Sequence, residues 1–252
     1  MLDNSLSVKE QLKRNMEYIS KKYKADKFIA YFQNYTNTYM DTERFKSYIS
    51  DAIMDNIVEI AISTRPDCIS DDKLKFLEQI HNENNVNITM ELGLQTVNYH
   101  TLININRGHT LAEFIDGVLR IKKYNFEICT HVILNLPGDT VTDTVETAKI
   151  LSALGVDQVK IHSLYIMENT EMGRLYKNKE INIISKDEYV ERVVAFLEHL
   201  NKDIVVQRLA GRAPKENSLF VNWGMSWWKL KDEILYKMES ENRHQGSKNK
   251  FI

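Results

Sequence analysis

Residues 127–164 read EICTHVILNLPGDTVTDTVETAKILSALGVDQVKIHSL, and this stretch decides the fold. Two short β-branched runs, EICTHVIL and VDQVKIHSL, flank a pattern of helical period that Gly155 closes, as glycine often closes a helix. A strand, a helix and a second strand in one such stretch predict two parallel strands joined by a right-handed crossover.

The same unit recurs towards the N-terminus. Three further runs, FIAYF (28–32), IVEIAI (57–62) and VNITMEL (86–92), predict strands, and patterns of helical period separate them. Ser70 is a good candidate for a helix N-cap, and Thr110 with Glu113 predicts a capping box. Repeated β/α units favour a TIM-like barrel, part of one, or an open doubly wound sheet.

The segment beyond residue 175 follows another pattern. SKDEYVERVVAFLEHL (185–200) predicts an amphipathic helix, and DIVVQRLAG predicts a last strand after it. NWGMSWWKLKDEILYKMESE (222–241) predicts an aromatic-rich helix, and the end, SENRHQGSKNKFI, is expected to be frayed. At helical spacing, Trp223, Trp227 and Trp228 are expected to pack this tail against the core, with stacking on nucleic-acid bases as the alternative.

Composition limits the classes of function. With 43% hydrophobic and 27% charged residues among 252, the chain is not of a disordered class. A net charge of −2 provides no overall field that would attract nucleic acid or an anionic membrane. No signal peptide and no run of apolar residues of membrane-spanning length is present, so we expect a cytoplasmic protein without a membrane partner.

The carboxyl ends of the predicted strands are rich in polar residues. Because parallel strands of β/α folds deliver their carboxyl ends to one edge, these side chains are expected to line a single cavity. No glycine-rich phosphate loop of the GxGxxG or GxxxxGK[ST] type follows any strand. The polar residues at the strand ends include Asn34, Asn37, Thr38, Ser63, Arg65, Gln95 and Asn135.

The alternation of side chains within the strands adds three residues to this cavity. Glu91, His131 and His162 each fall on a face that also carries the polar strand ends, if those faces point inward. Each histidine is equally well explained as a core residue with satisfied hydrogen bonds. Glu91 is equally well explained as a buried carboxylate paired with Arg65 or Arg107.

Seven segments in order resemble the radical S-adenosylmethionine (SAM) superfamily, and within it the YtqA/YhcC-like group. The resemblance covers residues 27–250, and no single segment carries it alone. The segments are IAYFQNYTNTY, ISTRPDCI, ELGLQT with INRGHT, CTHVILNLPGDT, VKIHSLYIMENTEMGRLY, VVQRLAGRAP and NWGMSWWKL.

The resemblance implies an incomplete TIM-like (β/α)6 partial barrel over residues 1–176 and a mainly helical C-terminal extension over residues 177–252. It further implies an enzyme that binds SAM above a [4Fe–4S] cluster and cleaves SAM reductively to a 5′-deoxyadenosyl radical, with an electron donor as partner. For the substrate it points to tRNA and the side chain of a wobble uridine.

The resemblance also assigns parts of a SAM site. The loop that contains Asn34, Asn37 and Thr38 matches the loop that holds the methionine amino group. Ser63 and Arg65 match the polar end of the following strand.

Further on in the chain, Gln95 matches a residue near the ribose, and Arg107 matches an arginine that reaches the SAM carboxylate. His131 stands where relatives of the coproporphyrinogen-oxidase type have an aspartate that lines the SAM site. Asn135, in the NLPG turn, matches a motif along the adenine. No catalytic residue is assigned.

The chain departs from the family at the cluster. The defining CxxxCxxC loop and the strand before it are missing from this sequence, and Cys68 and Cys129 are its only cysteines. Free cysteines are often only small buried apolar residues. We therefore expect a truncated radical SAM enzyme that is inactive alone, with no metal ligands of its own, and self-association through the unpaired edge strand at residues 28–32.

Two other functions stay open. One is a non-catalytic module that binds a nucleoside or RNA and has lost the cluster. The other is a TIM-type hydrolase with a divalent metal at Glu91, His131 and His162. Basic residues that could contact tRNA phosphates, or form an ordinary solvated surface, are Arg208, Arg212, Lys215, Lys229 and Lys231.

Overall fold

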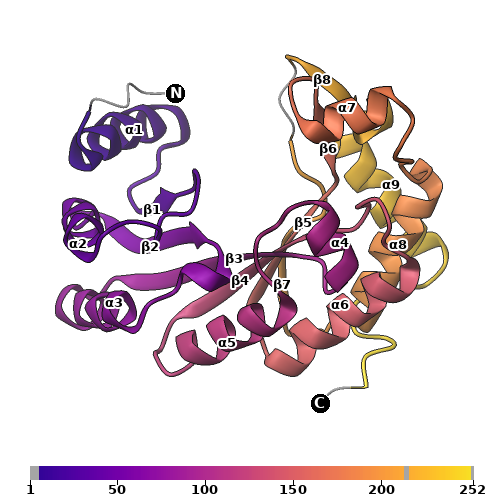
Figure 1. Ribbon diagram of the computed structural model, residues 1–252. Helices are drawn as coiled ribbons and strands as arrows, with labels where there is room; N and C mark the ends of the chain where they lie inside the picture. The colour runs from indigo at the N-terminus through magenta and orange to yellow at the C-terminus, as the bar shows by residue number, and fades with distance from the viewer. Residues whose placement is uncertain (1–5, 213–215, 251–252) are drawn as a thin grey trace. The chain divides into compact units, whose positions relative to one another are not determined.

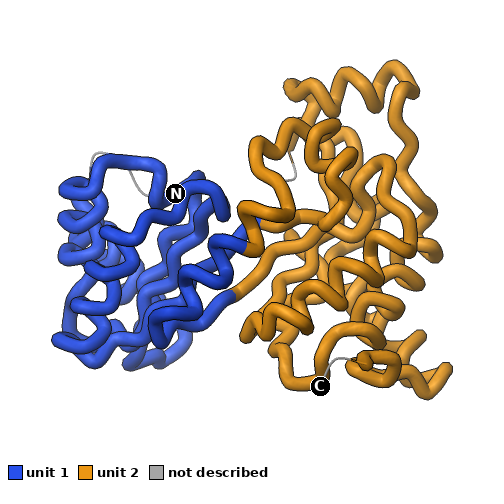
Figure 2. The backbone as a smooth tube through the Cα atoms, turned by 60° about the horizontal axis from the view of Figure 1, so that its bottom comes forward, with its two compact units in different colours: residues 1–93, 116–128 blue, residues 94–115, 129–252 orange. Residues whose placement is uncertain are grey.

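The computed structural model describes residues 6–212 and 216–250. It divides into two compact units, shown in Figure 2. Unit 1 consists of residues 1–93 and 116–128, and unit 2 of residues 94–115 and 129–252. The predicted boundary after residue 176 lies inside unit 2, and the two sequence-based domains stay a prediction.

Unit 1 is a parallel β/α layer. Strand β1 (Phe28–Phe32) pairs with β2 (Ile57–Thr64), and β2 pairs with β3 (Asn87–Gln95), both in parallel. β3 passes into unit 2 with its last two residues. The helices of this part of the chain are α1 (Val8–Tyr23), α2 (Thr42–Asp51), the 3₁₀ turn η1 (Pro66–Cys68) and α3 (Asp71–Asn84) (Figure 1).

Unit 2 also alternates parallel strands with helices, and it contains a small second sheet. Strand β4 (Glu127–Ile133) pairs in parallel with β5 (Gln158–His162), which pairs in parallel with β7 (Val205–Arg208). β6 (Tyr165–Met167) and β8 (Ser218–Val221) form a separate antiparallel pair. α5 (Leu111–Ile121) passes into unit 1 after residue 115, and the chain returns to unit 2 within β4, after residue 128. The other elements of unit 2 are α4 (Tyr99–Asn104), α6 (Val141–Leu154), α7 (Glu171–Lys177), α8 (Lys186–His199), η2 (Asn222–Gly224) and α9 (Trp227–Ser240).

Local sequence signals explain where the crossover helix α6 begins and ends. Thr140 and Asp143 form a reciprocal capping box at its start, and Gly155 ends it at a φ of 59°, in the left-handed region. The strands on either side of α6 bury β-branched residues such as Val132, Val159 and Ile161. The predicted strand–helix–strand unit is therefore confirmed.

Parallel strands that alternate with helices in both units confirm the predicted α/β class. Thr110 and Glu113 form the predicted capping box, with the Thr110 N–H donating to the Glu113 carboxylate at 2.7 Å. Ser70 takes the N-cap position of α3, but its side chain makes no capping hydrogen bond. None of the helices in the described ranges combines the length and apolar character that crossing a bilayer would need.

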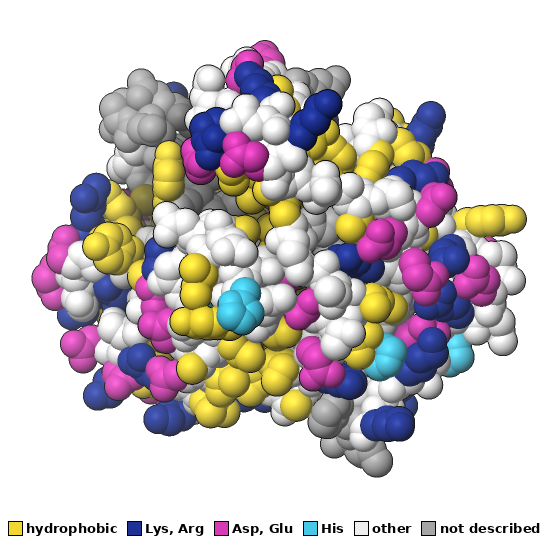
Figure 3. Space-filling view, turned by 45° about the vertical axis from the view of Figure 1, so that its right-hand side comes forward, with side chains coloured by type: hydrophobic (Ala, Val, Ile, Leu, Met, Phe, Trp, Pro, Cys, Tyr) yellow, Lys and Arg dark blue, Asp and Glu magenta, His cyan; other side chains and the backbone are white. Residues whose placement is uncertain are grey.

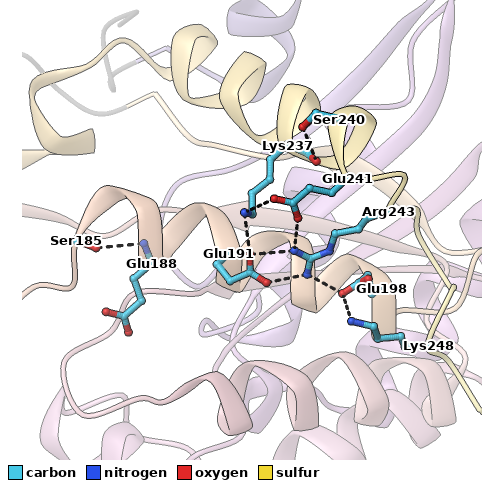
Figure 4. A network of polar contacts seen from close by, with 9 residues as sticks. All are labelled: Ser185, Glu188, Glu191, Glu198, Lys237, Ser240, Glu241, Arg243 and Lys248. Carbon is cyan, nitrogen blue, oxygen red and sulfur yellow. Dashed lines mark hydrogen bonds and ion pairs between the residues drawn. The ribbon is translucent and has the colours of Figure 1, made fainter.

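The prediction of a frayed C-terminal end is wrong for the residues up to 250. Arg243 forms ion pairs with Glu191 and Glu198 of α8, both at 2.7 Å, as Figure 4 shows. Lys248 pairs with Glu198 at 2.7 Å, and the side chain of Gln245 donates to two backbone carbonyls. The segment is polar, so ion pairs and hydrogen bonds, rather than the burial of apolar side chains, hold it against α8.

The aromatic helix also begins later than predicted. Residues 218–221 form β8, and residues 222–224 form a turn in which Trp223 has a φ of 52°. The helix α9 starts only at Trp227. Packing holds this left-handed turn, which local propensity disfavours for a tryptophan.

Candidate functional site

Glu91 of β3 is the centre of a polar cluster in unit 1. Its side chain is almost wholly buried, with 3% exposed. Tyr31 of β1 donates its hydroxyl to Glu91 Oε2 at 2.6 Å, and Ser63 of β2 donates to the same oxygen at 3.1 Å. The strand register accounts for this arrangement, because Ser63 lies directly opposite Glu91 in the β2–β3 pair. Unit 1 therefore presents a buried carboxylate to two hydroxyl donors.

The loop after β1 is fixed by the side chain of Asn37. Its Nδ2 donates to Phe32 O at 2.8 Å and to Ser63 O at 2.9 Å. Two carbonyl acceptors determine which way the amide faces, because only the NH₂ group can donate to them. Among the residues that the structure describes, no donor contacts Asn37 Oδ1. The loop thus presents an oriented amide oxygen beside the carboxyl ends of β1 and β2.

A buried lysine holds the far end of the same loop. Lys73 of α3 is 7% exposed and donates to Thr38 O and Met40 O, both at 2.7 Å. Thr38 in turn contacts the hydroxyl of Thr64 at 2.5 Å and donates to Cys68 O at 2.7 Å. These bonds fasten residues 36–40 to β2 and α3 along most of the loop.

Arg65 and Asn34 are the other two predicted site residues of unit 1. Arg65 forms a bidentate pair with Asp67, at 2.9 and 2.6 Å. Asn34 is exposed. The structure therefore links Asn37, Ser63 and Glu91 through direct contacts, whereas Thr38 contacts Thr64, Cys68 and Lys73.

In unit 2, the two predicted histidines meet. Their rings stack with centroids 5.1 Å apart, and His162 Nε2 lies 3.2 Å from His131 Nδ1. Arg208 of β7 approaches the same Nε2 at 2.7 Å. Because a guanidinium can only donate, Nε2 of His162 is the acceptor in the contact with Arg208. A Cβ at Gly211 would lie 3.2 Å from His162, so the glycine lets the chain pass over the ring.

The arginine bears on the metal-hydrolase hypothesis. A divalent cation bound by both histidines would need a lone pair of His162, but Arg208 already uses Nε2 and would repel a cation there. The sequence did not predict this contact, although Arg208 closes the strand that follows α8. The geometry of the histidine pair therefore favours hydrogen-bond chemistry.

Asn135 follows β4 and is buried, with 1% exposed. Its Oδ1 accepts from the N–H of Leu164 at 2.7 Å. Its Nδ2 is a buried donor that has no hydrogen-bond partner within the described residues. A ligand acceptor at that nitrogen would satisfy it.

The two other predicted residues of unit 2 lie at backbone irregularities. Gln95 ends β3 with a φ of 74°, an unusual conformation for a residue other than glycine. Arg107 lies between Asn106, at a φ of 51°, and Gly108, at 77°. Strained backbone at such positions is typical of ligand-binding segments.

Sequence reasoning missed Asp139, which directly follows the NLPG turn. Burial raises the pKa of its carboxyl, and hydrogen bonds from Thr101 and Thr96 partly oppose this. The signal in the sequence is an acidic residue in a segment that otherwise ends a buried strand. Asp139 is thus a second buried carboxyl near a strand end, in unit 2.

Comparisons with known proteins settle the family. The model of the radical SAM superfamily matches residues 4–151, and that of the radical SAM C-terminal domain matches residues 156–240. The chain belongs to the radical SAM superfamily. The predicted likeness to YtqA and YhcC is confirmed as well. The uncharacterized protein YtqA of Bacillus subtilis (strain 168) is 34% identical over 89% of this chain and 70% of YtqA. YhcC of Escherichia coli (strain K12) is 28% identical over 88% of the chain and 71% of YhcC.

More distant relatives show the fold. The solved archaeal Elp3 of Methanocaldococcus infernus, with an N-terminal deletion, superimposes with a TM-score of 0.78 at 18% identity. It covers 95% of this chain, which spans 60% of the Elp3 chain, and it confirms the predicted radical SAM half-barrel fold. A tRNA uridine(34) acetyltransferase of the same organism is 23% identical over 57% of this chain and 26% of its own length.

The superfamily implies SAM and a [4Fe–4S] cluster, and these two groups fit the residues differently. Such a cluster is held by cysteine thiolates. The 252 residues contain two cysteines. Cys129 is wholly buried within β4, and burial raises the pKa of the Cys68 thiol, which disfavours the thiolate. These residues do not fit a cluster. The oriented Asn37 oxygen of unit 1 is an acceptor and the unsatisfied Asn135 nitrogen of unit 2 is a donor, and each by itself is a group that a polar ligand such as SAM can bond.

Proposed function

We propose that this chain is the SAM-binding core of a radical SAM enzyme whose substrate is an RNA. The observation that carries the proposal is the Asn37 amide, which two carbonyl acceptors turn so that its oxygen stays available. The α-amino group of SAM is a cation with N–H donors, and an amide oxygen is a suitable acceptor for it. In the superfamily, SAM supplies a 5′-deoxyadenosyl group for radical chemistry.

The remaining polar strand ends have separate tasks in this proposal. Arg107 binds the SAM carboxylate, as a guanidinium is suited to do, and Gln95 binds the ribose. The left-handed backbone at Gln95 supports this role because such strain persists where the surrounding structure imposes it. Asn135 donates its unsatisfied Nδ2 to the adenine.

The proposed substrate is a tRNA, at the side chain of a wobble uridine. The relative named tRNA uridine(34) acetyltransferase supports this class of substrate. Arg208 is one of the basic residues that the sequence offered for phosphate contacts, but it contacts His162 instead. Lys215 lies outside the described residues. Arg212 and Lys229 are exposed and remain candidates for phosphate contacts.

SAM binding to the isolated chain tests the proposal. Arg107→Ala and Gln95→Ala are each expected to weaken SAM about tenfold, the effect of losing one charge-assisted or strong hydrogen bond. Equilibrium dialysis with labelled SAM measures the affinity. Arg14→Ala is the matched control, since this arginine is exposed on α1 and, among the described residues, pairs with Glu10 alone. Wild-type affinity in both site variants contradicts the assignment of the pocket.

A nucleoside- or RNA-binding role without turnover is the second candidate, because the two cysteines do not fit a cluster. Anaerobic incubation with iron, sulfide, a reductant and SAM separates the two. Formation of 5′-deoxyadenosine shows a catalytic chain. SAM binding without that product shows the non-catalytic role.

A further inference from the structure

A cavity of about 730 Å³ lies in unit 2, and its walls carry none of the residues proposed to bind SAM. The cavity is formed by β8, by residues 222–226 and by the first turn of α9, together with Arg212. Figure 1 labels the strand and the helix. Three tryptophans and Phe220 line it. Its volume is within the range typical of sites for small organic ligands.

Trp223 lines the cavity, and its own side chain is fixed by a hydrogen bond and by ring contacts. Trp223 donates its indole N–H to Ile184 O at 2.9 Å. Its ring packs against Tyr189 at 5.0 Å and perpendicular to Phe220 at 5.3 Å. For this residue the predicted packing role is confirmed. The left-handed turn at Asn222, Trp223 and Gly224 is therefore fixed by its largest side chain.

The other two tryptophans are not accounted for by packing. Trp227 is 39% exposed and Trp228 is 53% exposed, and their rings meet edge to face at 6.0 Å. In the described part of the chain, neither indole N–H has a hydrogen-bond partner, unlike that of Trp223. Exposed indoles on a cavity wall are the arrangement by which proteins stack planar ligands.

The charges near the tryptophans favour an anionic ligand. Arg212 lines the cavity and is exposed, and Lys229 is exposed on the first turn of α9, which carries no acidic residue. On the face that Figure 3 shows, Lys and Arg side chains lie among Asp and Glu side chains. A ligand that combines planar rings with negative charge matches exposed indole rings that lie near basic side chains.

We propose that the cavity takes up an unpaired base of an RNA strand, which stacks on Trp228 with the perpendicular ring of Trp227 beside it, while a neighbouring phosphate contacts Arg212. The inference rests on the proposed RNA substrate and locates part of its binding surface. Sequence-specific proteins commonly bind RNA at unpaired loop bases, because these can leave the stack and lie on an aromatic ring. A fully paired RNA offers no such base.

The test uses the full chain and two RNA probes of equal length, one a hairpin with an unpaired loop and the other a fully paired duplex. Tryptophan fluorescence quenching and anisotropy give the affinities. Trp228→Ala is expected to weaken hairpin binding about tenfold. Trp228→Phe keeps a π-face and is expected to retain most of the affinity. Arg212→Gln is expected to lower the slope of log affinity against log salt by about 0.7.

Tyr236→Ala is the matched control, because Tyr236 is a 71%-exposed aromatic residue of the same helix and does not line this cavity. It is expected to bind the hairpin as the wild type does. Unchanged hairpin binding by Trp228→Ala, or equal binding of hairpin and duplex, overturns the inference. Quenching by an apolar peptide but not by RNA also overturns it and replaces RNA with a protein partner.

SAM affinity, measured on the same variants, separates this inference from the proposed function. Trp228→Ala is expected to bind SAM as the wild type does. If the chain binds the hairpin through Trp228 but binds no SAM, the SAM proposal is wrong and the cavity inference stands. If the chain binds SAM through Arg107 but the Trp228→Ala variant binds RNA as the wild type does, the cavity inference is wrong and the SAM proposal stands.

Discussion

The two units bury charged side chains in different ways. In unit 1, neutral groups contact two buried charges: Lys73 donates to two backbone carbonyls, and Glu91 accepts from the hydroxyls of Tyr31 and Ser63. Unit 2 instead brings opposite charges into contact, with Arg243 between the carboxylates of Glu191 and Glu198 (Figure 4).

The difference has consequences for stability. Neutral partners do not titrate, so the contacts of Lys73 to carbonyl oxygens do not depend on the protonation of a carboxylate. An ion network depends on its carboxylates being charged, and it weakens as they take up protons. The neutral arrangement is found beside the proposed ligand loop, and the ionic arrangement docks the C-terminal segment.

The largest expected effect comes from Lys73→Met. Methionine fills much of the same space but leaves the carbonyl oxygens of Thr38 and Met40 without their donor, at a cost of about 3 kcal/mol of unfolding free energy. Urea unfolding measures the loss. Lys75→Met, on an exposed position of the same helix, is expected to stay within about 0.5 kcal/mol. Equal effects of the two changes contradict a role for the carbonyl contacts.

Arg243→Gln is expected to have the next largest effect, about 2 kcal/mol at neutral pH. Its side chain is 15% exposed, and that of Glu198 is 4% exposed. Arg174→Gln is the matched control, because Arg174 also pairs with two glutamates but is 51% exposed, and such pairs contribute little. A loss at Arg174 as large as that at Arg243 contradicts the importance of burial.

The same variant has a defined pH dependence. The hydrogen bond from Arg243 lowers the pKa of Glu191, with a further contribution from Lys237 against the effect of burial. A carboxyl with a lowered pKa in the folded state adds stability above its unfolded pKa, near 4.3, and loses it as pH falls through the folded pKa. The difference between wild type and Arg243→Gln is therefore expected to shrink below about pH 4. A difference that stays constant with pH contradicts the ionic reading.

Much of the fold could be predicted because its signals are local. The predicted strand at residues 28–32 matches β1 residue for residue, since β-branched and aromatic runs between helical patterns leave little choice. The β6–β8 pair was missed because its strands are short and about fifty residues apart in sequence. The docked end was missed because Arg243 and Lys248 find their partners only after α8 is in place.

The site was predictable to the extent that side-chain alternation governs it. The period of two placed His131 and His162 on a common side, and their rings do stack. Alternation could not supply Arg208, because its contact depends on the β5–β7 register, which has an irregularity just before it. Ser63 could have been found as a partner of Glu91, since it follows from aligning the two strands.

The smallest expected effect concerns that partner and sharpens the description of unit 1. Tyr31→Phe and Ser63→Ala each remove one hydroxyl from Glu91, and each is expected to cost about 1 kcal/mol. The loss should be somewhat larger for Tyr31, whose bond to Oε2 is 2.6 Å long against 3.1 Å for Ser63, although its partial exposure lets water compensate. Tyr18→Phe, at an exposed tyrosine of α1, is the control for losing a hydroxyl. If both site variants unfold at the urea concentration of the wild type, other groups hold the Glu91 charge, and the contrast with the ionic network of unit 2 no longer holds.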